Sequence, residues 1–329
     1  MDDPAKSRKH APAAYPGSLH HFAPRLVAFE HAPPSTDSSS RPSQNILLFI
    51  GGLGDGLLTV PYTPSLSAHL PASWSLAQIM LSSSYIGWGT SSVSEDAKEI
   101  GQCVSYFRDL RGPNTRVVLL GHSTGCQDVM EYMTGKQVAS RPRVDGAIMQ
   151  APVSDREGSV YLMSPEVYAR SVKVAREYVA RGDGEDILPT VVSANFFGSP
   201  CSARRWLSLA SPDHDGDEDF FSSDLTDEQL KSTFGSLGNI DTPLCILYSG
   251  KDQFVPPFVD KQGLVDRWIS ISKAAGGRID EKHSGLIKEG DHTFKDLPRE
   301  VLEDLERRVI GFIKRVDSGD FRSDASEKL

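Results

Sequence analysis

The sequence is poor in cysteine, and it has no cysteine pair at the spacing of a metal site or a redox motif. Four cysteines occur in 329 residues, and they lie far apart at Cys103, Cys126, Cys201 and Cys245. Disulfide-stapled secreted domains and structural zinc sites need more cysteines at closer spacing. We therefore expect reduced thiols, three of them within buried helices or strands.

Positive charge and long apolar runs are also scarce. The chain has 35 Lys and Arg against 44 Asp and Glu, which gives a net charge of −9, and it has no basic stripe. This balance excludes a nucleic-acid partner, because such binding needs Lys and Arg clustered against phosphates. The polar N-terminal sequence lacks the apolar segment of a secretory signal, and no run is long enough to span a membrane. We expect a soluble protein of the cytoplasm.

The apolar segments that are present follow the pattern of an α/β protein. Apolar residues make up 39% of the chain and charged residues 24%, which is the range of globular proteins. Continuous apolar runs typical of buried strands alternate with amphipathic segments typical of helices. The predicted strands are 26–30, 45–50, 75–81, 116–120, 145–152 and 243–250. This alternation predicts a mostly parallel sheet with helices on both faces.

The same pattern divides the chain into segments. Residues 1–23 are predicted to be a loose polar arm, and residues 24–152 together with 241–317 to form the α/β core. Residues 153–240 interrupt the alternation with helical patterns, and we expect a helical cap over the carboxyl edge of the sheet. Residues 318–329 are predicted to be a polar tail.

A dense acidic patch, Asp213 to Asp219, lies within the predicted cap. Alternating aspartates could direct several oxygens at one cation, but the rest of a calcium loop is missing. Blocks of like charge repel one another and stay exposed, so we interpret the patch as a solvated loop and predict no metal site.

The motif Gly-His-Ser-Thr-Gly occupies residues 121–125, between a predicted buried strand and a predicted helix. Strand, Gly-x-Ser-x-Gly and helix together are typical of a nucleophile elbow, in which a sharp turn lifts the serine hydroxyl above the end of a sheet. Glycines beside a serine are also ordinary loop chemistry, so the alternative is a turn without a catalytic role. The flanking strand and helix favour Ser123 as a nucleophile.

A serine hydroxyl needs a base to take its proton and a carboxylate to orient that base. Asp252 follows the strand 243–250 by two residues, and His292 follows a predicted last strand, 283–288, just before a helix that begins near Pro298. Either residue could instead be structural, as a turn-forming aspartate or an exposed loop histidine. The chain order of serine, aspartate and histidine favours a catalytic set.

The glycine-rich residues 51–56 follow the strand 45–50 and are suited to an oxyanion hole. Such a site needs two backbone N–H groups aimed at a developing negative oxygen. We predict the amides of Thr124, directly after the nucleophile, and of Leu53, with Gly54 as the alternative to Leu53. The glycine spacing does not fit a dinucleotide-binding motif and no Gly-Lys-Ser/Thr follows, so we expect no nucleotide.

These motifs resemble those of the α/β-hydrolase superfamily over nearly the whole chain. The longer strings Gly-Gly-Leu-Gly-Asp-Gly (51–56) and Gly-His-Ser-Thr-Gly-Cys-Gln-Asp (121–128) are similar to a fungal and plant branch that includes intracellular siderophore esterases of filamentous fungi. Those enzymes cleave ester bonds of fusarinine-type siderophores and free the bound iron. The resemblance implies that Ser123 attacks an ester carbonyl, that His292 acts as base and then acid, and that Asp252 orients it. It implies no cofactor, since any iron would arrive with the substrate.

The substrate is assigned only by this resemblance, as a small-molecule ester such as a ferric siderophore. Five aromatic residues of the predicted cap could form pocket walls or pack in the core of the cap: Phe196, Phe197, Trp206, Phe220 and Phe221. Two alternatives stay open. One is a hydrolase of another ester, a lipid or a thioester, and the other is a non-catalytic receptor that keeps the fold.

Overall fold

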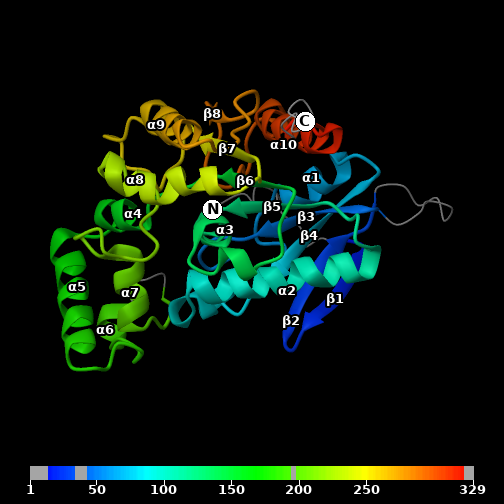
Figure 1. The fold of residues 1–329 in the computed structure, drawn as a ribbon. Coiled ribbons are helices and arrows are strands. Elements are labelled where there is room, and N and C mark those ends of the chain that lie inside the picture. Colours follow the sequence, from blue (N-terminus) through cyan, green and yellow to red (C-terminus); the bar gives the residue numbers. More distant parts are fainter. Residues whose placement is uncertain (1–13, 34–42, 194–197, 322–329) are drawn as a thin grey trace, which may run out of the picture.

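The computed structural model describes residues 14–33, 43–193 and 198–321, and the framework of these residues is one eight-stranded sheet (Figure 1). The strands are β1 (Gly17–Ala23), β2 (Leu26–His31), β3 (Asn45–Ile50), β4 (Trp74–Met80), β5 (Val117–His122), β6 (Gly146–Gln150), β7 (Leu244–Ser249) and β8 (Gly285–Ile287). Their order across the sheet is β1-β2-β4-β3-β5-β6-β7-β8. From β4 to β8 neighbouring strands pair in parallel, whereas β2 runs antiparallel to both β1 and β4. The predicted mostly parallel sheet is confirmed.

The central strands are buried on both faces, which explains their continuous apolar sequences. Successive side chains of a strand point to opposite faces. In β3, Ile46 and Leu48 accordingly join one hydrophobic cluster, while Leu47 and Phe49 join the other. The sheet therefore separates two cores.

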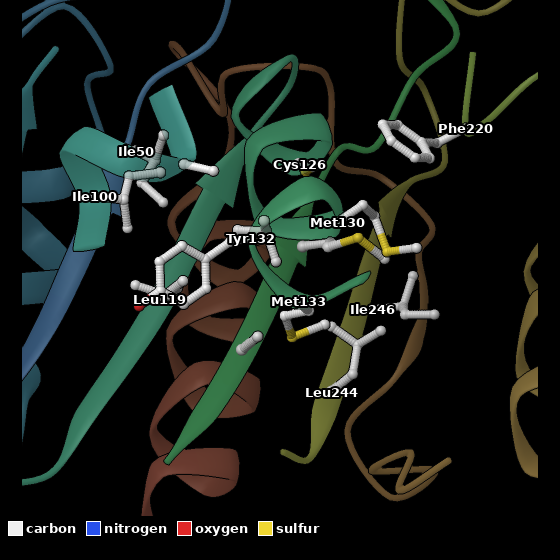
Figure 2. Packing of buried hydrophobic residues seen from close by; sticks show 14 of the residues in the cluster. Ile50, Ile100, Leu119, Cys126, Met130, Tyr132, Met133, Phe220, Leu244 and Ile246 are labelled. Atoms are coloured by element: carbon white, nitrogen blue, oxygen red, sulfur yellow. The ribbon is translucent and has the colours of Figure 1, made fainter. Parts of the chain in front are cut away.

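Helices cover both faces of the sheet. The first face carries α2 (Val93–Arg111), α3 (Gly125–Thr134) and α9 (Lys261–Ala274), and the second carries α1 (Thr63–His69) and α10 (Arg299–Ser318). Figure 2 shows Met130 and Met133 of α3 beside Leu244 and Ile246 of β7, all within the first core. The helix that follows Ser123 is thus held firmly against the sheet.

Side chains of capping residues satisfy backbone groups at the starts of several helices. The Ser92 hydroxyl accepts the backbone N–H of Glu95 at 3.2 Å at the start of α2. Thr226 and Gln229 form a reciprocal capping box at the start of α8 (Asp227–Thr233). Such caps satisfy N–H groups that have no partner within the helix.

The chain between β6 and β7, which we call the insertion (residues 153–240), is helical. It contains α4 (Asp155–Leu162), α5 (Pro165–Ala180), α6 (Thr190–Ser193), α7 (Ala203–Ala210), α8 and the 3-10 helix η3 (Phe234–Asn239). In Figure 1, α5, α6 and α7 lie to one side of the sheet. Their hydrophobic cluster also includes Leu53, after β3, and Trp88, in the 3-10 helix η1 (Tyr85–Thr90) after β4. The insertion therefore contacts loops at the carboxyl ends of two strands, and its role as a cap stays a prediction.

Three predicted boundaries differ from the structure. Gly17–Ala23 forms β1, so the predicted arm is wrong over these residues, and residues 1–13 lie outside the described ranges. β1 is an edge strand with mostly exposed side chains, which is why no apolar run marks it. The last strand is limited to 285–287, with His283 in the turn before it. α10 extends to Ser318, and the tail beyond 321 lies outside the described residues.

The four cysteines are free and buried, as the sequence predicts. Burial raises the pKa of the Cys201 thiol to about 12, which makes a reactive thiolate scarce at neutral pH. No helix in the described ranges is long and apolar enough to cross a bilayer.

Candidate active site

Ser123 lies at a strained turn between β5 and α3. Its φ of 55° falls in the left-handed region, which residues other than glycine rarely adopt. β5 ends at His122 and α3 begins at Gly125, so the turn is tight. The backbone N–H of Ser123 donates to the carbonyl of Gln150, at the end of β6, at 3.0 Å. Strand, strained serine and helix together have the geometry of a nucleophile elbow.

Three glycines allow the chain to pack this closely around Ser123. A Cβ atom on Gly121 would lie 2.3 Å from the carbonyl oxygen of Gly125, and one on Gly125 would lie 2.5 Å from that of Ile50. A Cβ atom on Gly52 would lie 2.6 Å from the Cβ of Ser123. Larger residues at these positions would push the elbow away from the end of β3.

His292 and Asp252 form a buried pair. Nδ1 of His292 lies 2.7 Å from Oδ2 of Asp252, and the backbone N–H of His292 donates to Oε1 of Gln253 at 3.2 Å. The ring of Phe254 packs edge-on against the imidazole, with 4.6 Å between ring centroids. An ionised Asp252 accepts the Nδ1 proton, so the neutral ring carries its lone pair on Nε2.

A second histidine, His122, stands beside His292, with 4.9 Å between the ring centroids. Its Nδ1 lies 2.5 Å from Oε1 of Gln150, which also accepts the hydroxyl of Tyr62 at 2.9 Å. Burial and the neighbouring His292 lower the pKa of His122 to about 4. His122 is therefore neutral at physiological pH and does not disfavour a positive charge on His292.

Gln150 connects the nucleophile to the acid–base pair. Its backbone carbonyl holds the Ser123 N–H, and its side-chain amide donates to the carbonyl of His292 at 3.5 Å. Ser123, Asp252 and His292 thus follow β5, β7 and β8 at the same edge of the sheet. Within the described residues no hydrogen bond joins the Ser123 hydroxyl to His292. Such bonds are often formed only when substrate binds.

Asp55 organises the loop after β3. Its Oδ2 accepts the backbone N–H of Gly52 at 2.9 Å, which removes that amide from any contact with substrate. Among the described residues, the N–H groups of Leu53 and Thr124 have no hydrogen-bond partner. The N–H of Gly54 is equally unpaired, so both candidates for the second oxyanion amide stay open.

Of the five aromatic residues predicted near the substrate, the structure describes three, Trp206, Phe220 and Phe221. Phe196 and Phe197 lie outside the described residues. Trp206 is 3% exposed in the cluster of the insertion, and Phe220 and Phe221 are 7% and 1% exposed in the first core. Their burial favours hydrophobic packing, the alternative that the sequence left open, and a role as pocket walls stays a prediction.

The acidic patch Asp213–Asp219 is ion-paired in part. Glu218 is buried in an ion pair with Arg205 of α7, and Asp219 pairs with Arg156 of α4 at 3.2 Å. The prediction of a solvated loop is wrong for these two residues, because arginines of neighbouring helices reach them. No cluster suited to a metal ion occurs among the residues that the structure describes.

A group of acids next to the elbow could not be recognised from the sequence. Asp96 of α2 and Asp128 of α3 are buried together, and Asp155 of α4 is half-buried beside them. Burial and the adjacent Asp96 hold the pKa of Asp128 well above its ordinary value. Burial raises the pKa of Asp96 to about 6. Only tertiary structure brings these separate aspartates together, and the one local signal is the place of Asp128 in the first turn after Ser123.

Comparison with known proteins gives matches over nearly the full chain. A family model described as "Protein of unknown function (DUF1749)" matches residues 7–314. An esterase of Emericella nidulans is 38% identical, covering 94% of this chain and 94% of its own. A protein named fusarinine C esterase, from Aspergillus fumigatus, is 36% identical, covering 91% of this chain and 95% of its own.

Solved structures agree with these matches. The siderophore hydrolase EstB from Aspergillus fumigatus is 34% identical, with a TM-score of 0.79 over 92% of this chain and 98% of that one. An α/β-hydrolase fold protein of unknown function, 18% identical, has a TM-score of 0.61 over 96% of this chain and 100% of that one, and shows the fold alone. The chain therefore belongs to the DUF1749 family and is a hydrolase with the α/β-hydrolase fold.

Proposed function

We propose that this protein is a serine esterase that works through an acyl-enzyme intermediate, with a siderophore ester of the fusarinine type as its substrate. The observation that carries the mechanism is the strained Ser123 beside the buried His292–Asp252 pair. The substrate class rests on the similarity to relatives named fusarinine C esterase and siderophore hydrolase.

The first half of the reaction forms the acyl-enzyme. The Ser123 oxygen attacks the ester carbonyl while Nε2 of His292 takes the hydroxyl proton. Asp252 holds the imidazole by its Nδ1–H and stabilises the positive charge that develops on the ring. The tetrahedral intermediate then collapses, His292 returns the proton to the leaving alkoxide, and an alcohol departs.

The unpaired amides of Thr124 and Leu53 are suited to the negative oxygen of that intermediate. An amide without a competing partner is preorganised, because no hydrogen bond must break before it meets the oxyanion. Asp55 contributes indirectly, since its hold on the Gly52 N–H fixes the path of the loop. Removal of one such donor typically costs about 10²–10³-fold in turnover.

In the second half, water attacks the acyl-enzyme with His292 again as base, and Ser123 is regenerated with release of the acid. For a cyclic ferric siderophore, each cleavage hydrolyses one ester bond and lowers the affinity of the siderophore for iron. The four free cysteines are in keeping with a reducing compartment, and the cytoplasm stays the predicted location. A different ester, a lipid or a thioester is the alternative substrate.

Hydrolysis of fusarinine C tests this proposal. The purified protein is incubated with iron-free and ferric fusarinine C and with short acyl esters, and the products are followed by mass spectrometry. We expect ring-opened fragments that have gained water, and none with Ser123→Ala. Ser140→Ala, an exposed serine at the end of the 3-10 helix η2 (Val138–Ser140), serves as the matched control.

Two outcomes would contradict the proposal at different levels. Cleavage that persists in Ser123→Ala would rule out the assigned nucleophile. If the siderophore stays intact while short esters are hydrolysed rapidly, the protein is an esterase but fusarinine C is not its substrate.

A further inference from the structure

The carboxylate of Asp155 lies near the elbow, and among the described residues it forms no ion pair. It is the first residue of α4, just after the chain leaves β6 next to Ser123, and it is half-buried. Its Oδ2 accepts the side-chain amide of Gln127 at 2.5 Å, and Gln127 lies one helical turn beyond Ser123. Within the described residues, no cation lies within ion-pair distance of Asp155 and its Oδ1 accepts no hydrogen bond.

Two cations act on Asp155 from a distance, Arg205 and His292. Arg205 is itself buried in an ion pair with Glu218, and its Nε donates to the carbonyl of Trp88 at 2.7 Å. Two acids, Asp128 and Asp219, also interact with Asp155 electrostatically. Burial raises the pKa of Asp155 to about 6, against the opposing effect of the positive charges of Arg205 and His292. At neutral pH the carboxyl is therefore mostly ionised, and among the described residues it has no ion-pair partner.

Three buried oxygens at the start of α3 also lack a hydrogen-bond partner. Among the described residues these are Oε1 of Gln127, Oγ1 of Thr124 and Oδ1 of Asp128, and all three side chains are almost fully buried. Thr124 is the N-cap of α3, and Gln127 and Asp128 lie in its first turn, so all three follow Ser123 closely in the chain. Buried acceptors without a donor are costly, and most have a partner in native proteins. This group of acceptors is complementary to a ligand that brings several donors.

A primary ammonium group has the required properties. It carries one positive charge and three N–H donors, and it accepts no hydrogen bond. A hydroxyl or a neutral amide would supply donors but would leave the charge of Asp155 uncompensated. A metal ion is less suited, because the described residues offer no cluster of metal-ligating side chains here.

We propose that Asp155, with Gln127 and Thr124, binds a protonated amine that the substrate carries close to its scissile ester. This proposal rests on the proposed esterase function and narrows its substrate class to amino esters. Asp155 would then determine specificity, holding the amine while the neighbouring carbonyl faces Ser123.

Binding to the Ser123→Ala protein tests this subsite without any need for hydrolysis. Phenylalanine ethyl ester and ethyl 3-phenylpropanoate differ only by the amine, and their dissociation constants are measured by calorimetry at pH 7. We expect the amino ester to bind at least about 10-fold more tightly, as hydrogen bonds to a charged group imply. Asp155→Asn in the same background should abolish the preference, because the amide keeps the contact with Gln127 but loses the charge.

Asp217→Asn is the matched control, since Asp217 is an exposed aspartate of the acidic patch. The preference should survive there. Equal affinity for both esters, no detectable binding of the amino ester, or a preference that survives Asp155→Asn would overturn the proposal. An equal loss of affinity for both esters in Asp155→Asn would assign a structural role instead and also overturn it. Because the readout is binding, it is independent of whether the wild-type protein hydrolyses fusarinine C.

Discussion

At Gly52 the loop after β3 passes directly beside the nucleophile. A Cβ atom there would lie 2.6 Å from the Cβ of Ser123 and 3.1 Å from both its Oγ and the carbonyl oxygen of His122. The backbone oxygen belongs to the end of β5 and cannot move without moving the elbow. The closeness of the two chains is therefore a condition for the oxyanion geometry.

Gly52→Ala should lower kcat for a short acyl ester by about 10²-fold, the effect of misplacing one oxyanion donor. The fold should survive, because the clash is confined to a loop at the sheet edge. Steady-state kinetics and thermal unfolding measure the two effects separately. Gly101→Ala in α2 is the control, since its added Cβ would meet only ordinary van der Waals contact, at 3.4 Å from Pro142. Unchanged kcat in Gly52→Ala would show that the loop does not constrain the site.

Single residues with a local signature could be predicted from the sequence. Ser123 has its motif, and Asp252 and His292 follow predicted strands in the expected order. Gln150 and Asp155 could not be identified in this way, because their importance comes from what adjacent strands and helices place beside them. A glutamine in an otherwise apolar strand was the one available hint for Gln150.

At the scale of elements, η1 joins the loop after β3 to the insertion. The backbone N–H of Tyr85 donates to the carbonyl of Asp55 at 2.8 Å. On the other side, the N–H of Ser202 donates to the carbonyl of Gly89 at 2.8 Å, and Nε of Arg205 donates to that of Trp88 at 2.7 Å. The start of α7 is thus connected through η1 to the loop beside Ser123.

Arg205→Met should destabilise the protein by about 3–5 kcal/mol, because it leaves the buried carboxylate of Glu218 without its cation. Arg205→Met with Glu218→Gln removes that charge and should recover a large part of the loss. Urea unfolding of the single and double variants measures both values. A double variant as unstable as the single one would show that the lost contacts to η1, rather than the buried charge, hold α7 in place.

Helices and strands could be predicted where burial requires a recognisable pattern of apolar residues in the sequence. The runs in β3, β5 and β7 are continuous because both faces are covered. β1 could not be predicted from the sequence, because its side chains are mostly exposed and its stability comes from pairing with β2. The ion pairs of Glu218 and Asp219 were missed for a similar reason, since their partners lie on other helices.

At the scale of the whole molecule, the parallel sheet gathers the loops that carry the site. Parallel strands have their carboxyl ends at one edge, so loops distant in sequence meet there. The insertion contacts this same edge through Leu53 and Trp88. The fold class and the edge that carries the chemistry could therefore be predicted from periodicity alone. Substrate choice could not, because it depends on side chains such as Asp155 that no pattern marks.

If Ser123 is a nucleophile activated by His292 and Asp252, a fluorophosphonate should modify it covalently. The folded protein is labelled with such a probe, and the modified residue is located by peptide mass spectrometry. We predict one labelled peptide, containing Ser123, with strongly slowed labelling in His292→Ala and labelling at the wild-type rate in Ser140→Ala. A folded wild-type protein that takes no label, or takes it at another serine, would show that Ser123 is not the nucleophile.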